Sequence, residues 1–149
     1  MENVRLPSTL RRIEYSAFEG CGCLRHITLP ERLECVGRKC FCQSALEVVE
    51  VPPALNTVGR KAFATRCCLK KIEFLEGRTL LWADRQDSGG WNRAFRDSRA
   101  EEVVLPGTLR EISPNVFRGC KNLRVVRMAE GSEVDVARLV DSSVEVRRN

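Results

Sequence analysis

Residues 6–30 read LPSTLRRIEYSAFEGCGCLRHITLP and begin and end on the same dipeptide, Leu-Pro. Between the prolines lie a Leu-x-x-Ile pair, a small residue followed by Phe18, and a Leu-x-x-Ile-x-Leu segment. The arrangement returns around Phe41, Phe63, Phe95 and Phe117, at successive spacings of 23, 22, 32 and 22 residues. A fixed period in this range indicates a chain built from repeated structural units.

Each Phe is followed by a segment that we expect to form a strand. Its first, fourth and sixth residues are apolar, and the last two of these alternate around one residue, as in a half-buried strand. Gly37 and Gly59 follow the Val of a turn, where we expect a tight bend with positive φ. The five expected strands are LRHITL (24–29), LEVVEV (46–51), LKKIEF (69–74), AEEVVL (100–105) and LRVVRM (123–128).

The repeat predicts a solenoid. One such unit cannot bury its own apolar side, whereas stacked units bury their Leu, Ile and Phe residues in one continuous core. Five units exceed the minimum of about three that stability requires. We therefore predict a single domain over residues 1–149, of the repeat-solenoid α/β class with mostly β structure and about five turns of 22–23 residues.

The regularity fails at two places. The spacing of 32 residues between Phe63 and Phe95 indicates about ten extra residues in the fourth unit, which we assign to an insertion within residues 76–92. This stretch contains both tryptophans, Trp82 and Trp91, with a Ser-Gly-Gly turn signal between them. Residues 129–149 are expected to form a degenerate capping repeat, with a last strand at residues 144–146.

The repeat LP-x-x-L-x-x-I-x-x-x-AF-x-x-C-x-x-L-x-x-I-x-LP resembles the BspA-type leucine-rich repeats. The matching stretches are LPSTLRRIEYSAFEGCGCLRHITLP, LPERLECVGRKCFCQSALEVVEVP, LNTVGRKAFATRCCLKKIEF and LPGTLREISPNVFRGCKNLRVVRM. The resemblance implies a curved, right-handed coil and a role in protein binding. Members occur on bacterial and protist surfaces and inside cells.

Composition argues against several classes of function. No apolar run approaches the roughly 20 residues of a membrane helix, and the opening residues show no secretory h-region. We therefore expect a cytoplasmic or otherwise intracellular protein, with a surface location as the alternative if the sequence is a piece of a longer chain. The chain has one histidine, His26, and no nucleotide-binding or nucleophile-elbow motif. We accordingly predict no enzymatic activity, no cofactor and no metal site.

The eight cysteines lack the paired C-x-x-C spacing of a zinc site. Cys21, Cys67, Cys68 and Cys120 lie near the turn after a Phe, and Cys40 occupies the small position before Phe41. Free cysteine is among the most buried residue types. We interpret these residues as structural thiols, with disulfides or zinc as the weaker alternatives.

We predict that the partner binds the concave face of the curved coil, which the outward residues of the strands form. They form two columns, because residues on either side of an inward residue point away from the core. Asn3 and Arg5 extend them at the N-terminal end. The mixture of both charge signs with exposed Val suits a protein partner, although a merely solvated face is the simpler alternative. The columns are His26, Val48, Lys71, Glu102 and Val125, and Thr28, Glu50, Glu73, Val104 and Arg127.

We predict a protein-protein interaction module or scaffold that uses this face together with Trp82 and Trp91, whose side-chain type is enriched at binding hot spots. The alternative for the two tryptophans is that both fold back to cover the interrupted core. A place in a larger assembly is compatible with this role. The alternative is anion or nucleic-acid binding through a basic strip beside the Phe column, although the strip lacks interleaved aromatic residues. Its members are Arg38, Lys39, Arg60, Lys61, Arg93, Arg96 and Arg118.

Overall fold

The computed structural model describes residues 3–64, 69–77, 80–81, 95, 98–112, 116–117, 120–132, 134–136 and 143–148. These residues form short strands and turns, with no helix among them, which confirms the predicted mostly-β solenoid. The strands are β1 (Asn3–Val4), β2 (Arg12–Ile13), β3 (His26–Ile27), β4 (Cys35–Val36), β5 (Val48–Val51), β6 (Thr57–Val58), β7 (Lys71–Phe74), β8 (Leu80–Leu81), β9 (Glu102–Val104), β10 (Glu111–Ile112), β11 (Val125–Met128) and β12 (Glu145–Arg148).

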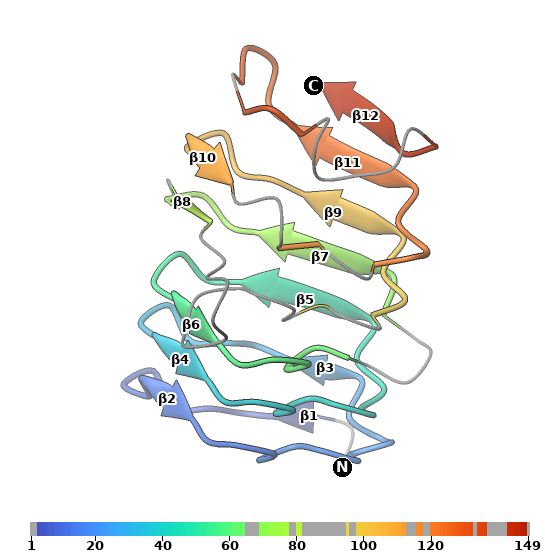
Figure 1. Ribbon diagram of the computed structural model, residues 1–149. Helices are drawn as coiled ribbons and strands as arrows, with labels where there is room; N and C mark the ends of the chain where they lie inside the picture. The colour runs from blue at the N-terminus through green and yellow to red at the C-terminus, as the bar shows by residue number, and fades with distance from the viewer. Residues whose placement is uncertain are drawn as a thin grey trace.

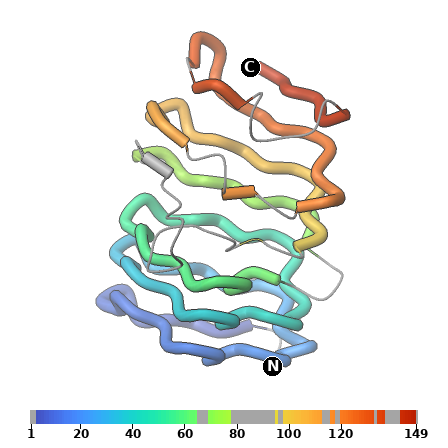
Figure 2. Tube along the Cα trace, viewed as in Figure 1, coloured from blue at the N-terminus to red at the C-terminus, as the bar shows by residue number. Residues whose placement is uncertain are grey.

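The turns stack along one axis, with the two ends of the chain at opposite ends of the stack (Figure 1, Figure 2). Each pairing between these strands is parallel and joins one turn to the next. One wall contains β1-β3 and the five-stranded sheet β5-β7-β9-β11-β12. The second wall contains β2-β4-β6 and β8-β10. The repeated unit therefore contributes a strand to both walls.

A third wall is a backbone ladder between the residues that surround each Phe. The amide of Phe18 donates to the carbonyl of Cys40 and the amide of Phe41 donates to that of Ala62, both at 2.8 Å. Lys39 and Lys61 adopt φ of 58° and 60°, a left-handed conformation that costs a non-glycine residue free energy. The ladder bonds of each turn to its neighbours offset this cost.

The core is a column of phenylalanines between the walls. Phe18, Phe41 and Phe63 stack at centroid distances of 5.4 and 5.5 Å, with interplanar angles of 1° and 10°. Phe95 continues the column at 5.3 Å from Phe63, and Phe117 lies 6.0 Å further along. The predicted Phe register is confirmed. Before three of these rings, Cys40, Ala62 and Val116 are fully buried beside the column, whereas Ala17, before Phe18 in the first turn, is exposed.

The fourth turn keeps the regular residue spacing as far as Leu81, although its sequence suggests an earlier departure. β8 pairs with β10 so that Leu81 aligns with Ile112. Leu81 lies seven residues after Phe74, the same interval that separates Leu105 from Ile112. Leu81 therefore takes the place of the Ile or Val that the other turns carry five residues before Phe. Fourteen residues separate Leu81 from Phe95, against five in the other turns, so the nine surplus residues lie in this interval.

The glycines after β4 and β6 serve a different purpose from the predicted one. Gly37 and Gly59 are absent from the residues with positive φ. A Cβ on Gly37 would instead lie 2.5 Å from the amide nitrogen of Tyr15, and one on Gly59 would collide with the backbone of Arg38. The prediction of a positive φ was wrong, because close approach of the preceding turn is what excludes a side chain.

The corner after β7 lacks the proline found at other corners and is held by side-chain hydrogen bonds to the next turn. Leu75 and Glu76 follow Phe74 where Pro stands in other turns. The carboxylate of Glu76 accepts a hydrogen bond from the amide of Gly107 at 2.9 Å, and the amide of Gly77 donates to the hydroxyl of Thr108 at 3.0 Å. These bonds join the corners of the fourth and fifth turns.

Candidate partner-binding face

The outer sheet face is the solvent-facing side of β1, β3, β5, β7, β9, β11 and β12, and it carries both predicted columns. In β5, Val48 and Glu50 are exposed while Val49 and Val51 are buried, and β7, β9 and β11 alternate in the same sense. The inward residues leave almost no surface in solvent, so the strands are fixed by the core. The predicted orientation of the columns is therefore confirmed, while their role in binding stays a prediction.

Strand pairing places the columns in register from turn to turn. Val48 aligns with Lys71, Lys71 with Glu102, and Glu102 with Val125. Glu50, Glu73, Val104 and Arg127 form the second column in the same way. The register of β1 on β3 aligns Asn3 with His26, which puts Arg5 beside Thr28 at the N-terminal end. Side chains from sequence positions more than 100 residues apart thus share one surface.

Two residues that the sequence prediction omitted extend the columns. β12 pairs with β11 so that Glu145 aligns with Val125 and Arg147 with Arg127. The alternation of Val144, Glu145, Val146 and Arg147 carried this signal, but the strand begins and ends later than predicted. The guanidinium of Arg147 donates to both carboxylate oxygens of Glu145, at 2.8 and 3.1 Å. This contact lowers the pKa of Glu145 and raises that of Arg147.

Ion pairs cover the middle and the C-terminal part of the outer sheet face. Nε of Arg127 lies 2.5 Å from a carboxylate oxygen of Glu102 on the neighbouring strand. Nζ of Lys71 lies 4.0 Å from a carboxylate oxygen of Glu73. Such partly exposed pairs at a protein surface contribute little to stability, typically below about 1 kcal/mol. Their effect here is to orient the side chains and to cancel charge locally.

Val48 interrupts these charges with an apolar side chain. It is 37% exposed and lies between the N-terminal turns and the ion-paired part of the face. Val104 and Val125 are half-buried further along the same face. Small apolar patches among paired charges can contact a protein surface without leaving buried charge unpaired.

The basic strip is only partly within the described residues. Arg38 is exposed, and Lys39, Arg60 and Lys61 are half-buried. The amide of Lys39 donates to the carbonyl of Arg60 at 3.2 Å, so the two basic pairs lie on adjacent turns, beside the third wall. The other members, Arg93, Arg96 and Arg118, lie outside the described residues, as do Trp82 and Trp91.

Buried thiols in the core are poor nucleophiles. Burial raises the pKa of Cys40 to about 12, and burial likewise raises that of Cys120 to about 12. Cysteine attacks as the thiolate, so both are inert near neutral pH. Cys21, Cys23, Cys35 and Cys42 are also free thiols, while Cys67 and Cys68 lie outside the described residues. Within the described part of the chain, no group of three or more His, Cys, Asp or Glu side chains could hold a metal ion.

The chain matches the family described as BspA type Leucine rich repeat region, in six copies over residues 1–81 and 91–134. It belongs to this family. The gap in the match, residues 82–90, falls inside the interval between Leu81 and Phe95 that holds the surplus residues. No curated protein matches the sequence. No described helix of this BspA-type chain is long and apolar enough to cross a membrane.

Two solved structures are similar to the BspA-type chain. A leucine rich cell surface protein from Faecalibacterium prausnitzii A2-165 has a TM-score of 0.64 and 22% identity, over 89% of this chain and 33% of its own. A leucine-rich repeat protein from Bacteroides ovatus ATCC 8483 has a TM-score of 0.48 and 14% identity, over 100% of this chain and 54% of its own. The first likeness shows a shared fold, and the chain spans about a third of that protein's length.

Proposed function

We propose that the chain is a non-enzymatic repeat module that binds a protein partner on its outer sheet face. The observation that carries this proposal is the register of two columns of side chains on strands whose opposite side is buried. A surface held in place by its core loses little conformational entropy when it binds. Repeat solenoids of this kind present extended binding surfaces built from successive turns.

The chemistry of the face fits a protein better than a polyanion. The ion pairs of Lys71 with Glu73 and of Arg127 with Glu102 leave no continuous stripe of positive charge across β7, β9 and β11. Val48 supplies an exposed apolar contact in the same surface. Trp82 and Trp91 belong to the proposal as hot-spot side chains, on the strength of their residue type and their place in the surplus interval.

A pair of matched variants tests the use of the outer sheet face. Val48→Arg places a charge on an exposed position of β5, and Thr57→Arg places the same charge on an exposed position of β6 in the other wall. Each variant and the parent chain are cross-linked in lysate of the source cells, and the attached peptides are quantified by mass spectrometry. We expect Val48→Arg to lose the cross-links of the parent and Thr57→Arg to keep them. Equal losses, or cross-links from Val48→Arg at parent level, contradict the proposal.

Anion or nucleic-acid binding through the basic strip is the second candidate. It is favoured by the stacking of Arg38 and Lys39 on Arg60 and Lys61 in adjacent turns. Phosphate contacts release counterions, so this mode predicts a steep loss of affinity with added salt. Binding that survives an increase from about 50 to about 200 mM salt to within about threefold supports the protein-binding face, whereas a loss of about tenfold or more supports the strip.

We also propose that the chain works in a reducing, intracellular compartment. Eight cysteines in 149 residues, with the six described ones present as free thiols, suit an environment in which thiols stay reduced. The similar Faecalibacterium protein, by contrast, is described as a cell surface protein. Alkylation of thiols in unbroken source cells, followed by mass spectrometry of the chain, distinguishes the two locations. A membrane-impermeant reagent that labels exposed Cys23 contradicts the proposal.

A further inference from the structure

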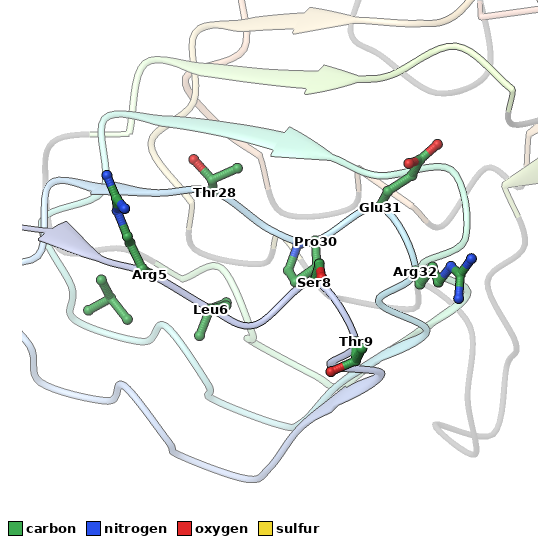
Figure 3. A pocket seen from close by; sticks show the side chains of 9 residues that line it. Arg5, Leu6, Ser8, Thr9, Thr28, Pro30, Glu31 and Arg32 are labelled. Carbon is green, nitrogen blue, oxygen red and sulfur yellow. The ribbon is translucent and has the colours of Figure 1, made fainter.

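A cavity of about 640 Å³ lies between the first and second turns, at the N-terminal end of the outer sheet face (Figure 3). Its walls are the chain segments that follow β1 and β3, together with the two Leu-Pro corners. Val4, Leu6 and Pro30 form its apolar part, and Ser8, Thr9 and Thr28 contribute hydroxyl groups. Ligand pockets commonly enclose about 300 to 1,000 Å³, so the volume suffices for a small group or a few peptide residues.

The charges of the cavity differ from those of the remaining outer sheet face. Arg5 and Arg32 line it, and neither guanidinium has a hydrogen bond or an ion pair within the described part of the chain. In β7, β11 and β12, Lys71, Arg127 and Arg147 each pair with a carboxylate. Arg148, the other basic residue of β12, donates to the carbonyl of Ser132 at 2.6 Å. The N-terminal end therefore keeps guanidinium donors available, whereas Lys71, Arg127 and Arg147 on the same face already bind carboxylates.

The two ends of the cavity are chemically distinct. Figure 3 shows Arg5 at one end and Arg32 with Glu31 at the other, with Ser8 and Pro30 between them. Continuing the β1-β3 register places Arg5 beside Thr28, so a guanidinium and a hydroxyl group both line this end of the cavity. Glu31 offsets the charge of Arg32 at the opposite end. An anion therefore has its most favourable electrostatic interaction at the Arg5 end of the cavity.

We propose that this cavity anchors an acidic segment of a protein partner. An Asp or Glu carboxylate accepts hydrogen bonds from Arg5 and Thr28, and a neighbouring apolar side chain lies on Leu6 and Pro30. Arginine suits this task because its planar fork of donors matches a carboxylate in a bidentate arrangement. The proposal rests on the proposed protein-binding function and specifies the chemistry of the partner at one end of the face.

A titration with short peptides tests the cavity directly. The full chain, labelled with ¹⁵N, is titrated with acetyl-Glu-Leu-amide and with its neutral counterpart acetyl-Gln-Leu-amide, and amide chemical shifts are recorded. We expect saturable shifts at Arg5, Ser8, Thr28 and Glu31 with the acidic peptide. We expect binding at least about tenfold weaker with the neutral peptide, because a hydrogen bond to a charged group contributes roughly 1.5–3 kcal/mol.

Two arginine variants give the titration its control. Arg5→Gln is expected to reduce the affinity for the acidic peptide to that for the neutral one. Arg124→Gln, at an exposed arginine outside the cavity, is expected to leave it within about twofold, the scale of a surface change away from the ligand. Unchanged spectra elsewhere show that both variants are folded. Absence of saturable shifts, or equal affinity of Arg5→Gln and the parent, overturns the proposal.

A third titrant separates a peptide site from a simple ion site. Sodium acetate presents the carboxylate without the apolar neighbour, and we expect it to bind at least about tenfold more weakly than the acidic peptide, since burial of one side chain contributes roughly 1.5–3 kcal/mol. Equal affinity for acetate overturns the peptide proposal. Failure of the cavity leaves the cross-linking result of Val48→Arg unaffected, so the two proposals fail separately.

Discussion

The first three turns and the last two turns of this chain build the same column from sequences of different regularity. In the first three, the residue counts between strands are nearly constant and the Phe rings are almost parallel, at 1° and 10°. The fourth turn holds nine surplus residues, yet Phe95 still lies 5.3 Å from Phe63. Toward Phe117 the rings tilt to 27°, and Phe74 meets both Phe95 and Phe117 edge-on. Register is therefore fixed by strand pairing between adjacent turns, and surplus residues between two paired positions do not displace the core.

The largest expected effect tests the regular part of the column. Phe41→Ala removes a fully buried ring that stacks on both sides, and it should lower the free energy of unfolding by about 3–5 kcal/mol. Urea denaturation followed by fluorescence measures the change. Tyr15→Ala, at an exposed position beside the same column, is the control and should cost less than about 1 kcal/mol. A loss below about 1 kcal/mol for Phe41→Ala would show that the column does not support the fold.

The close contact between turns is tested next. Gly59→Ala places a methyl group against the backbone of the second turn and should cost about 1–3 kcal/mol, as overpacking does elsewhere. Gly22→Ala is the matched control, because a Cβ there has no neighbour within 4 Å and Gly22 has no positive φ. The same denaturation assay compares them. Equal stability of the two variants would sink the explanation given for Gly37 and Gly59.

Two deletions of nine residues compare the fourth turn with the regular ones. Removing residues 82–89 and 91 joins Leu81 to Gly90 and restores the spacing of the third turn, including its glycine. Removing residues 82–90 gives the same length but leaves Trp91 where Gly59 stands in the third turn. We expect the first deletion to stay within about 1 kcal/mol of the parent and the second to lose a further 1–3 kcal/mol, roughly the cost of overpacking. Collapse of both would place the surplus residues in the core.

A buried thiol has an effect on stability that is absent near neutral pH and appears only at alkaline pH. Burial raises the pKa of Cys40 from 9.0 to about 12, so between these values the unfolded chain has lost a proton that the folded chain retains. Stability from this thiol is complete below pH 9.0 and declines as the pH rises toward 12. Cys40→Ala introduces the alanine that stands at the equivalent positions 17 and 62. It should reduce the loss of stability between pH 9 and 12, as measured by urea denaturation at each pH. An unchanged slope would assign the decline to other groups, Cys120 among them.

The comparison of the two parts also explains how far prediction from sequence reached. The Phe spacing predicted the solenoid and the core column, and the alternating segments predicted the outward orientation of residues such as Val48 and Lys71. Both predictions were possible because these patterns lie within one repeat and recur in every turn that stacks on it. The fourth strand of the second wall was not found, because Leu80 and Leu81 depart from the Ile or Val of other turns and are identified only by their pairing with Glu111 and Ile112. The binding role of the predicted columns, of the basic strip and of Trp82 and Trp91 stays a prediction.

The sequence by itself determined the period, the identity of the buried residues and the family, since these follow from side-chain chemistry at fixed intervals. Only the tertiary structure decided which charges meet. The pairing of Arg127 with Glu102, and the lack of a described partner for Arg5, depend on the alignment of strands about 20 residues apart in sequence. It also decided why Gly37 and Gly59 are glycines, because the atoms that exclude a side chain belong to the preceding turn.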